Sequence, residues 1–489
     1  MKIKIIISLT LFSMVVNGQV RQPHSLYFME TIPQITQMNP ALQPRANGYV
    51  MLPGVNVDLF SDLAVKDVLQ QRGAKWYAPH QKKYDYSKLW ESIGKKSAVF
   101  NVGADVDLFG FGFRAGNGYF SFGISEHVSV NAALPNDMFR IIDKGTPKPG
   151  SSLNFSSLNA QEIAYLQVNI GYSGRVNDRL TIGVNVKPLL GQAAIATKVD
   201  KFILYSKEFQ WDVDINTNVY SSKLIDEIFL NEKNQVDSVT IRKFDNYGTD
   251  DWVKDGINFL NRGIAFDFGM AFKVDERFTV SASLNNVGFI SWNDDLKGIS
   301  SKNAFPFKGL KYDTSQDDGI DDFFTAWADS LLHAIEFRKQ RDKFTTMLSP
   351  VLHVGASYQL SKAVSVGLLS RSTVWGKSVR QSFNGSFCLQ PYSFVAFNAG
   401  ATWQVKGNVY LGGGFTFLVG PLQVYLLLDH VPVYYSTIRI DKGDEIGEKI
   451  PYIPERLKSF TVRTGVNLVF GKQGLANKPM LDKGRSSWN

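Results

Sequence analysis

Apolar and polar residues alternate along much of the chain from about residue 49, and this alternation predicts β-strands. In the stretch GIAFDFGMAFKV (263–274), the even-numbered positions hold Ile, Phe, Phe, Met, Phe and Val, whereas Ala, Asp, Gly, Ala and Lys stand between them. The same pattern recurs in the stretches 179–189, 352–360 and 459–471. Each stretch therefore has one face of large apolar side chains and one face of small or polar side chains.

The predicted strands have roughly ten to thirteen residues, whereas strands of soluble proteins usually have about 5–6. A tilted strand that crosses an outer membrane needs about 9–11. In a soluble sandwich or propeller, which is the alternative, the solvent face is rich in Lys, Glu and Thr. Here the second face is mostly Gly, Ser, Asn and Thr, as is typical of a barrel lumen. We therefore expect an all-β fold, a single transmembrane antiparallel β-barrel over residues 48–471.

Connections of two different lengths support the same fold. Short turns are predicted at 176–178, 275–276, 361–362 and 420–421. Long connections are predicted near 61–97, 131–160, 293–343 and 431–458. Tight turns on one side of the membrane and long loops on the other are typical of outer-membrane barrels. The strand count lies between 14 and 16, and we predict fourteen because an even number returns both ends to the periplasm.

The two ends of the chain indicate where in the cell the protein is expected. Residues 1–18, MKIKIIISLTLFSMVVNG, have two lysines, an apolar core and small or polar residues after it, as in a secretory signal peptide. No later run reaches the roughly 18 apolar residues of a membrane helix. An exported chain with these strands is expected in the outer membrane of a Gram-negative bacterium, in contact with its lipid. Residues 472–489 are expected to form a basic periplasmic tail.

Composition changes this picture little. The chain has 489 residues, 44% hydrophobic and 13% aromatic, with 41 glycines, which suits a large antiparallel β-structure. The formal charge of +8 includes two lysines of the signal peptide, which leaves +6 for the rest. No cluster of Lys and Arg with interleaved aromatics is present, so nucleic-acid binding is not expected. A single cysteine, Cys388, excludes an intrachain disulfide and a cysteine-based zinc site.

Candidate catalytic chemistry is sparse. The six histidines are scattered, and the H-E-x-x-H, P-loop and G-x-S-x-G motifs are absent. Ser125 and His127 share one strand face, but no third member of a triad is evident. The acidic stretch 313–322 has five aspartates and no glutamate at the spacing of a calcium loop, so it reads as the start of a helix. We expect no enzyme activity, no cofactor and no metal.

Charged residues on the small-residue face are the more informative candidates. If that face is the lumen, both signs of charge occur inside the barrel. The charges could pair with one another or hold a plug, which is the interpretation we favour, or they could line a water path. The predicted lumen charges are Asp105, Asp107, Asp267, Arg371, Asp429 and Arg463.

Two long connections have helical character. Residues 317–342 begin with acidic and end with basic residues, and apolar residues recur at Phe324, Trp327 and Leu331. We expect an amphipathic helix over the barrel mouth, either as a cap on its own strands or as a surface for a partner protein. The stretch 249–261 is a shorter version.

The segment ITQMNPALQP (35–44) precedes the first predicted strand. Pro33, Pro40 and Pro44 rule out a regular strand or a long helix there. The segment is neither highly charged nor low in complexity, so it does not read as a disordered tail.

Within this segment, the sequence Asn39–Pro40–Ala41 just ahead of a barrel resembles the corresponding motif of fatty-acid-transporter-like (FadL-type) barrels and of PorV and PorP/SprF barrels of Bacteroidota. The stretches LNNVGFISW (284–292) and VRTGVNLVFG (462–471) resemble an uncharacterised outer-membrane family of the same phylum. The resemblance implies that residues 19–47 form a plug or hatch inside the lumen, with Asn39, Pro40 and Ala41 at its centre.

Two functions remain open at this stage. The first is a plugged barrel that serves as a subunit or anchor of an envelope complex for secretion or outer-membrane assembly, with other envelope proteins as partners. The alternative is a FadL-like transporter for a hydrophobic small molecule.

Overall fold

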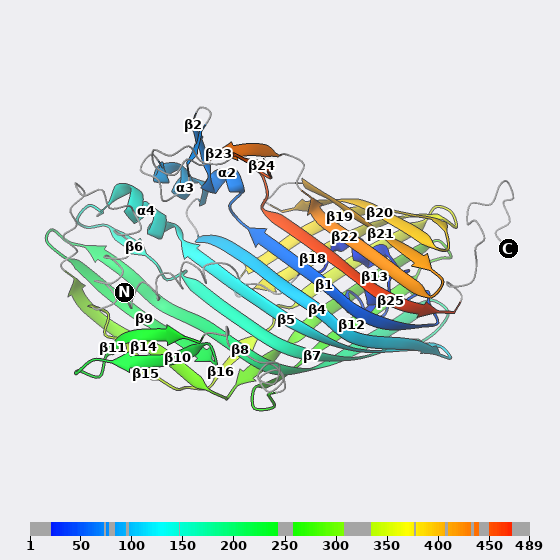
Figure 1. The fold of residues 1–489 in the computed structure, drawn as a ribbon, viewed down its shortest axis with the longest axis horizontal. Coiled ribbons are helices and arrows are strands. Elements are labelled where there is room, and N and C mark those ends of the chain that lie inside the picture. Colours follow the sequence, from blue (N-terminus) through cyan, green and yellow to red (C-terminus); the bar gives the residue numbers. More distant parts are fainter. Residues whose placement is uncertain are drawn as a thin grey trace.

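The fold is described by a computed structural model that covers residues 21–72, 75–77, 84–93, 97–145, 147–242, 258–307, 334–375, 378–405, 409–431, 435–439 and 449–471. Within these ranges, fourteen antiparallel strands form a barrel (Figure 1). In the order in which they pair, the strands are β1 (Gly48–Ser61), β4 (Ser97–Ala115), β5 (Gly118–Pro135), β7 (Asn159–Arg175), β8 (Leu180–Ser206), β12 (Arg262–Lys273), β13 (Phe278–Trp292), β17 (Val351–Gln359), β18 (Val364–Trp375), β19 (Ser378–Tyr392), β20 (Val395–Gln404), β21 (Val409–Val419), β22 (Leu422–Val431) and β25 (Ser459–Phe470).

The barrel closes between its first and last strands. Gly48 of β1 is paired with Phe470 of β25, and the other edge of β1 pairs with β4, where Gly48 meets Phe113. Closure leaves no unpaired strand edge, which is the condition for spanning a membrane with strands. The predicted count of fourteen strands is confirmed.

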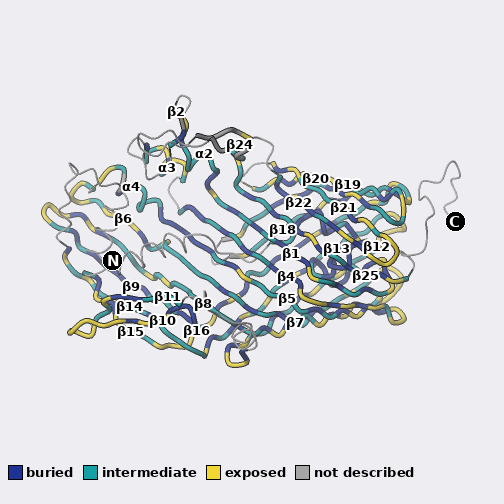
Figure 2. The backbone as a smooth tube through the Cα atoms, in the orientation of Figure 1, coloured by how far each residue is buried: buried dark blue, intermediate teal, exposed yellow. Residues whose placement is uncertain are grey.

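The two faces of each strand differ in the predicted way. On β12, Phe268 is 50% exposed on the outer surface, while its neighbour Asp267 is fully buried on the inside. The same alternation runs around the barrel, so that exposed and buried residues follow one another along most strands (Figure 2). The outward side chains that are more than a third exposed include Phe109, Phe111, Phe113, Phe120, Ile170, Tyr172, Ile182, Met270, Phe289, Leu352, Val354, Phe383, Phe397 and Phe415.

Short turns lie at one end of the barrel. Five residues or fewer join β7 to β8, β12 to β13, β17 to β18 and β21 to β22. All four turns agree with the turns predicted from the sequence. By the general rule for outer-membrane barrels, this end faces the periplasm.

At the opposite end the wall continues well beyond the length needed to cross a bilayer. β8 has 27 residues, of which those up to Leu190 pair with β12. From Ile195 onward β8 pairs instead with β9 (Trp211–Ser222), and β9 in turn pairs with β14 (Leu296–Phe307). Shorter strands complete this extension: β6 (Ser152–Asn154), β15 (Arg338–Gln340) and β16 (Phe344–Met347).

Small elements stand on this outer end. Three short helices are described there, α2 (Val65–Val68), α3 (Tyr86–Ile93) and α4 (Asn136–Lys144). Three hairpins accompany them: β2 (Gln70–Arg72) with β3 (Lys75–Tyr77), β10 (Ile225–Leu230) with β11 (Val236–Ile241), and β23 (Ser436–Arg439) with β24 (Lys449–Ile453). Among the described residues, no helix has the length and apolar character needed to cross a bilayer.

Several predictions concern residues outside the described ranges. These are the signal peptide (1–18), the basic tail (472–489), the acidic stretch 313–322 and the loop helix with Phe324, Trp327 and Leu331. Most of the stretch 249–261 also lies outside them.

Candidate functional site

Residues 21–47, here called the N-terminal segment, lie inside the barrel before the chain enters β1. It contains two short 3-10 helices of five residues each, η1 (His24–Phe28) and η2 (Pro33–Gln37). Its prolines explain this irregular form, because each proline lacks the backbone N–H that a helix or sheet needs. The segment runs from the level of Asp58 on β1 to the short-turn end, where Asn47 leads into the strand.

The Asn39–Pro40–Ala41 motif rests against β8, β12 and β13. Asn39 is fully buried. Its side-chain amide donates to the Tyr27 hydroxyl and to the carbonyls of Met270 and Ala282, at 3.2–3.4 Å. Its side-chain oxygen accepts from the backbone N–H of Ala41 at 2.9 Å. Asn39 therefore fixes the local turn and ties it to the wall at the same time.

An apolar contact fixes the other side of the segment. Side chains of η1, of the residues between η1 and η2 and of Met38 after η2 pack on inward-facing residues of β18, β20 and β22. Burial of such side chains from water is the main favourable term in packing of this kind. The contributors from the segment are Leu26, Tyr27, Met29, Ile32 and Met38, and those from the wall are Leu369, Ala396, Tyr425 and Leu427.

The six charges named from the sequence lie on β4, β12, β18, β22 and β25. Each of them is at most 5% exposed. Five of the six, namely Asp105, Asp107, Arg371, Asp429 and Arg463, bond to residues of the N-terminal segment.

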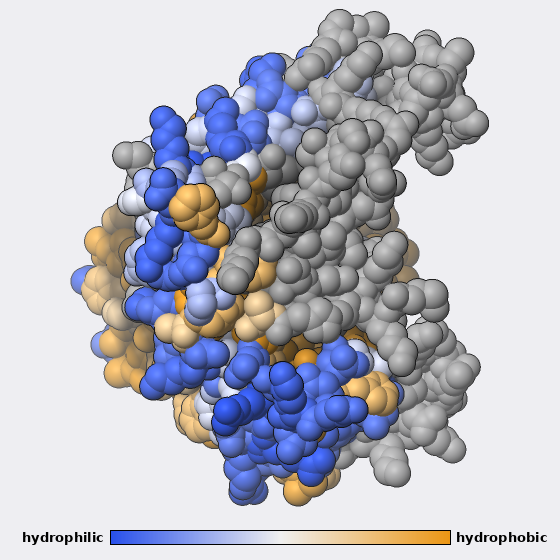
Figure 3. All heavy atoms as spheres, turned by 90° about the vertical axis from the view of Figure 1, so that its left-hand side faces the viewer, coloured by the Kyte–Doolittle hydropathy of each residue, from blue (hydrophilic) through white to orange (hydrophobic). Residues whose placement is uncertain are grey.

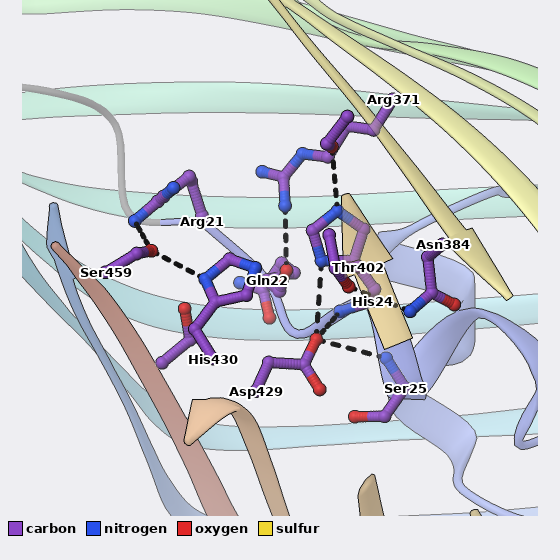
Figure 4. A network of polar contacts seen from close by, with 12 residues as sticks. Arg21, Gln22, His24, Ser25, Arg371, Asn384, Thr402, Asp429, His430 and Ser459 are labelled. Carbon is purple, nitrogen blue, oxygen red and sulfur yellow. Dashed lines mark hydrogen bonds and ion pairs between the residues drawn. The ribbon is translucent and has the colours of Figure 1, made fainter. Parts of the chain in front are cut away.

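One group of these contacts surrounds the start of the segment (Figure 4). Arg21 Nε donates to Asp58 Oδ2 at 2.9 Å, and Arg21 Nη2 donates to Ser459 Oγ at 2.9 Å. Asp429 on β22 accepts from the backbone N–H groups of His24 and Ser25, the latter at 3.3 Å. The two carboxylates therefore hold the segment through a guanidinium and through its backbone.

A second group links β4 and β25 to the segment. Arg463 is 1% exposed and its Nη2 donates to Asp107 Oδ2 at 2.6 Å. The same Nη2 donates to the side-chain oxygen of Gln37 at 2.8 Å. Asp105 accepts from Gln22 at 2.9 Å and lies 2.6 Å from His127 Nδ1. The attraction and the hydrogen bonds between these buried groups offset the free-energy cost of removing them from water.

The sixth charge, Asp267, is bonded within the wall. It lies 2.6 Å from Lys187 Nζ on the neighbouring strand β8, and it accepts from Asn185 at 2.9 Å and from the backbone N–H of Asn286 at 2.7 Å. Asn185 also donates to the carbonyl of Thr36 at 3.4 Å, so Asp267 is linked to the N-terminal segment through Asn185.

Little free space remains around the segment. A cavity of about 60 Å³ lies between it and the wall, next to Asp105, His127, Lys187 and Asn286. This volume holds a few water molecules and no drug-sized ligand. A larger cavity of about 1080 Å³ lies at the outer end, next to Trp90 of α3, Asp137 and Arg140 of α4, and Asn154.

An apolar cluster lies inside the barrel, between the charges and the outer end, and was not predicted from the sequence. Trp292 and Ile290 on β13 are fully buried and pack with Leu189 of β8 and Tyr165 of β7. We call this group the interior apolar cluster; it also contains Ile163, Ala194, Ala265 and Leu348. Simple alternation places Ser283 and Ile290 on opposite faces of β13, and a register irregularity between β12 and β13, next to Asn286 with its φ of 61°, turns Ile290 and Trp292 inward. The alternation of the sequence alone therefore gave no signal for this group.

A second apolar group lies in the outer extension. It packs side chains of β8, β9 and β14 against α4 and β6. Figure 3, which looks onto this end, shows hydrophobic atoms between hydrophilic loops. The members of this group are Ile141, Leu153, Phe155, Leu204, Trp211, Val213, Ile215, Phe307, Ile335 and Phe337.

The pair Ser125 and His127 forms no catalytic triad. Ser125 Oγ donates to Asp107 at 3.1 Å, whereas His127 contacts Asp105, so the serine and the histidine have different partners. Among the described residues, no group of three or more His, Cys, Asp or Glu side chains is arranged to hold a metal ion.

A closed barrel with a hydrophobic outer belt and a lumen that contains charge is an outer-membrane protein of a Gram-negative bacterium. The chain belongs to a family described as "Family of unknown function (DUF5723)", whose model matches residues 40–429. A comparison with curated proteins found no match.

Solved structures of similar architecture are FadL-type barrels. The toluene transporter TodX of P. putida is 9% identical, with 93% of this chain and 98% of TodX covered and a TM-score of 0.38. A FadL homologue of Pseudomonas aeruginosa is 10% identical, with 92% and 99% covered and a TM-score of 0.43. The monoaromatic hydrocarbon channel CymD is 11% identical, with 94% and 99% covered and a TM-score of 0.40. At this level of similarity, what those proteins transport is a property of those proteins.

Proposed function

We propose that the protein transports a hydrophobic small molecule across the outer membrane and that the N-terminal segment is the plug of its barrel. The observation that carries this proposal is the division of the interior along the barrel axis. The half near the short turns is filled by residues 21–47 and holds the buried charges as well as one apolar contact, whereas the half toward the outer end contains the interior apolar cluster.

This division suits a ligand that enters from outside. A hydrophobic molecule gains free energy when it leaves water for an apolar wall, at about 25 cal/mol per Å² of buried surface. It would then stop at the charged layer, because charges such as Asp267 and Lys187 do not exchange their partners for an apolar surface without cost. Movement of the plug is therefore required for passage.

Photolabelling tests the ligand part of the proposal. A hydrophobic probe with a diazirine group is added to the detergent-solubilised protein, irradiated and mapped by mass spectrometry. We expect labelled peptides from the inner face around Trp292, and competition by an unlabelled analogue. Trp292→Ala should reduce inner-face labelling, whereas Phe289→Ala, which changes an outward side chain of the same strand that is 40% exposed, should leave it unchanged. Equal labelling in both variants, without competition, would count against transport.

Deletion tests the plug part. A chain that lacks residues 21–45 between the signal peptide and β1 is reconstituted in a planar bilayer. We expect a large rise in conductance, because the deleted residues fill the lumen beside Asp107 and Arg463. An unchanged conductance in a variant that still forms the barrel would contradict the plug.

A second function is supported by the outer end. We propose, as the alternative, that the barrel is a subunit or anchor of an envelope complex, in the manner of PorV-type barrels of Bacteroidota. The observation that favours it is the outer extension with its hairpins and helices, which exceeds what a transport pore needs. Affinity purification in mild detergent distinguishes the two functions: a defined set of co-purifying envelope proteins supports the complex, and a monomer that carries a lipid-like ligand supports transport.

A further inference from the structure

Three of the six histidines of the chain lie in or beside residues 24–27 of the N-terminal segment, inside the barrel. His24 belongs to the N-terminal segment, His353 to β17 and His430 to β22, and all three are at most 3% exposed. The rings of His24 and His430 lie 5.5 Å apart (Figure 4), and the ring of His353 lies 5.6 Å from the ring of Tyr27 in the segment.

The charges that act on these histidines are Arg21 of the segment, Arg371 of β18 and Asp429 of β22. Arg21 is also bonded to Asp58 of β1. These two cations and two anions balance when the imidazoles are neutral. A further pair, Arg463 of β25 and Asp107 of β4, neutralises itself. Each proton added to a histidine is therefore an unbalanced positive charge in a buried site.

The hydrogen bonds of His353 also require its neutral form. Ser283 Oγ donates to the carbonyl of Met38 at 2.7 Å, so His353 Nδ1 carries a proton and donates to this hydroxyl at 3.3 Å. His353 Nε2 then presents a lone pair, and it has no hydrogen-bond partner among the described residues. A second proton would bury an N–H group without an acceptor.

His430 is in a similar position. Its Nδ1 contacts Ser459 Oγ, which also accepts from Arg21 Nη2 at 2.9 Å, and its Nε2 has no hydrogen-bond partner among the described residues. A charged His430 would bury an N–H group at Nε2 without an acceptor and would face the Arg21 guanidinium.

We propose that protonation of His24, His353 and His430 releases the N-terminal segment from the wall, so that acidification opens the lumen. The inference rests on the plug role proposed above. Arg21, Gln22 and Ser25 would leave first, because they share their partners Asp58, Arg371 and Asp429 with the histidine network. The Asn39–Pro40–Ala41 turn lies farther along the segment and would follow.

The direction of the pH effect is given by His24. Burial lowers the pKa of His24 below its usual 6.5; the bond to Asp429 acts in the opposite direction, and Arg371 lowers the pKa further. The released segment, whose histidine meets water, binds a proton more tightly than the docked segment. By linkage, the docked state has its full stability above about pH 6.5 and loses it as the pH falls below this value.

Thiol accessibility tests the release. Ser25 is 2% exposed and its hydroxyl has no hydrogen-bond partner among the described residues, so Ser25→Cys in a Cys388→Ser background removes no side-chain bond of Ser25. The reference is Lys362→Cys in the exposed turn between β17 and β18. The rate of reaction with a charged thiol reagent is measured at both sites, and the ratio of the two rates cancels the pH dependence of the reagent.

We expect this ratio to rise about tenfold or more between pH 7.5 and 5.0, since one pKa unit corresponds to a factor of ten. The combined replacement His24→Gln, His353→Gln and His430→Gln should abolish the rise. His127→Gln is the control for the loss of another inward-facing histidine, because His127 is bonded to Asp105 and not to Asp58, Arg371 or Asp429. A ratio that does not change with pH, or an equal rise in the triple variant, would overturn the proposal.

Heat-modifiable migration on a gel shows whether each variant still forms the barrel, and only variants that do are scored. This experiment can fail or succeed independently of the test of the transport function. A pH-dependent ratio without photolabelling of the inner face would support the release of the segment and contradict a hydrophobic ligand. Photolabelling with a ratio that does not depend on pH would support the ligand and contradict the release.

Discussion

Gly183 on β8 and Gly269 on β12 are register partners, and the Asn39–Pro40–Ala41 turn lies directly over both of them. A Cβ atom on Gly183 would stand 2.4 Å from the carbonyl carbon of Pro40. A Cβ atom on Gly269 would stand 2.1 Å from the side-chain oxygen of Asn39 and 2.9 Å from the N atom of Ala41. The wall is thus open at these two positions to admit the backbone of the segment.

Larger residues at these glycines should displace the segment and leave the barrel intact. For Gly183→Leu and Gly269→Leu we expect a rise in bilayer conductance, because the three nearest atoms to each added Cβ all belong to residues 39–41. Gly385→Leu is the control, since only Leu368 Cδ2, at 3.8 Å, lies within 4 Å of its added Cβ. Conductance that is the same in all three variants would argue against a docked segment.

Replacement of Asn39 by Asp, a side chain of the same size, should also weaken the docking of the N-terminal segment. The amide of Asn39 donates to the Met270 and Ala282 carbonyls, and a carboxylate oxygen in its place would face these oxygens without a proton. We expect easier release of the segment, measured as faster reaction of a cysteine at position 25 at pH 7.5. An unchanged rate would show that these bonds contribute little.

Loss of Arg463 should destabilise the barrel strongly. Arg463→Gln leaves Asp107 as a buried carboxylate without its cation, and removal of one partner of a buried pair costs about 3–5 kcal/mol. The double replacement Asp107→Asn and Arg463→Gln should recover much of this loss, because no charge then remains unpaired. Urea unfolding in lipid vesicles measures the free energy of unfolding. Equal losses in the single and double variants would exclude a specific pairing.

A charge on the outer belt should also be costly. Phe268 is 50% exposed on the outer face of β12, and Phe268→Lys should lower the free energy of unfolding by about 2–4 kcal/mol if the position faces hydrocarbon. Phe209→Lys is the control, because Phe209 is 86% exposed in the turn between β8 and β9. Similar effects of both substitutions would contradict the placement of the hydrocarbon belt.

The local alternation of apolar and polar residues was sufficient to predict the fold. Side chains of a strand alternate between its faces with a period of two, so the residues around Phe268 and Asp267 already tell which face is apolar. Tight turns such as the one between β7 and β8 are equally local, and the two patterns together predicted fourteen strands.

The partners of those charges depend on contacts between distant parts of the chain. Arg463 and Asp107 are 356 residues apart, and only the closure of β25 on β1 and β4 brings them together. Contacts between distant parts of the chain also decide that β8 pairs with β12 up to Leu190 and with β9 from Ile195 onward. They likewise bring β7, β8 and β13 together around Trp292 to form the interior apolar cluster. The periodicity of the sequence describes one strand at a time. These features depend instead on which strands become neighbours in the barrel and on which part of the lumen the N-terminal segment does not fill.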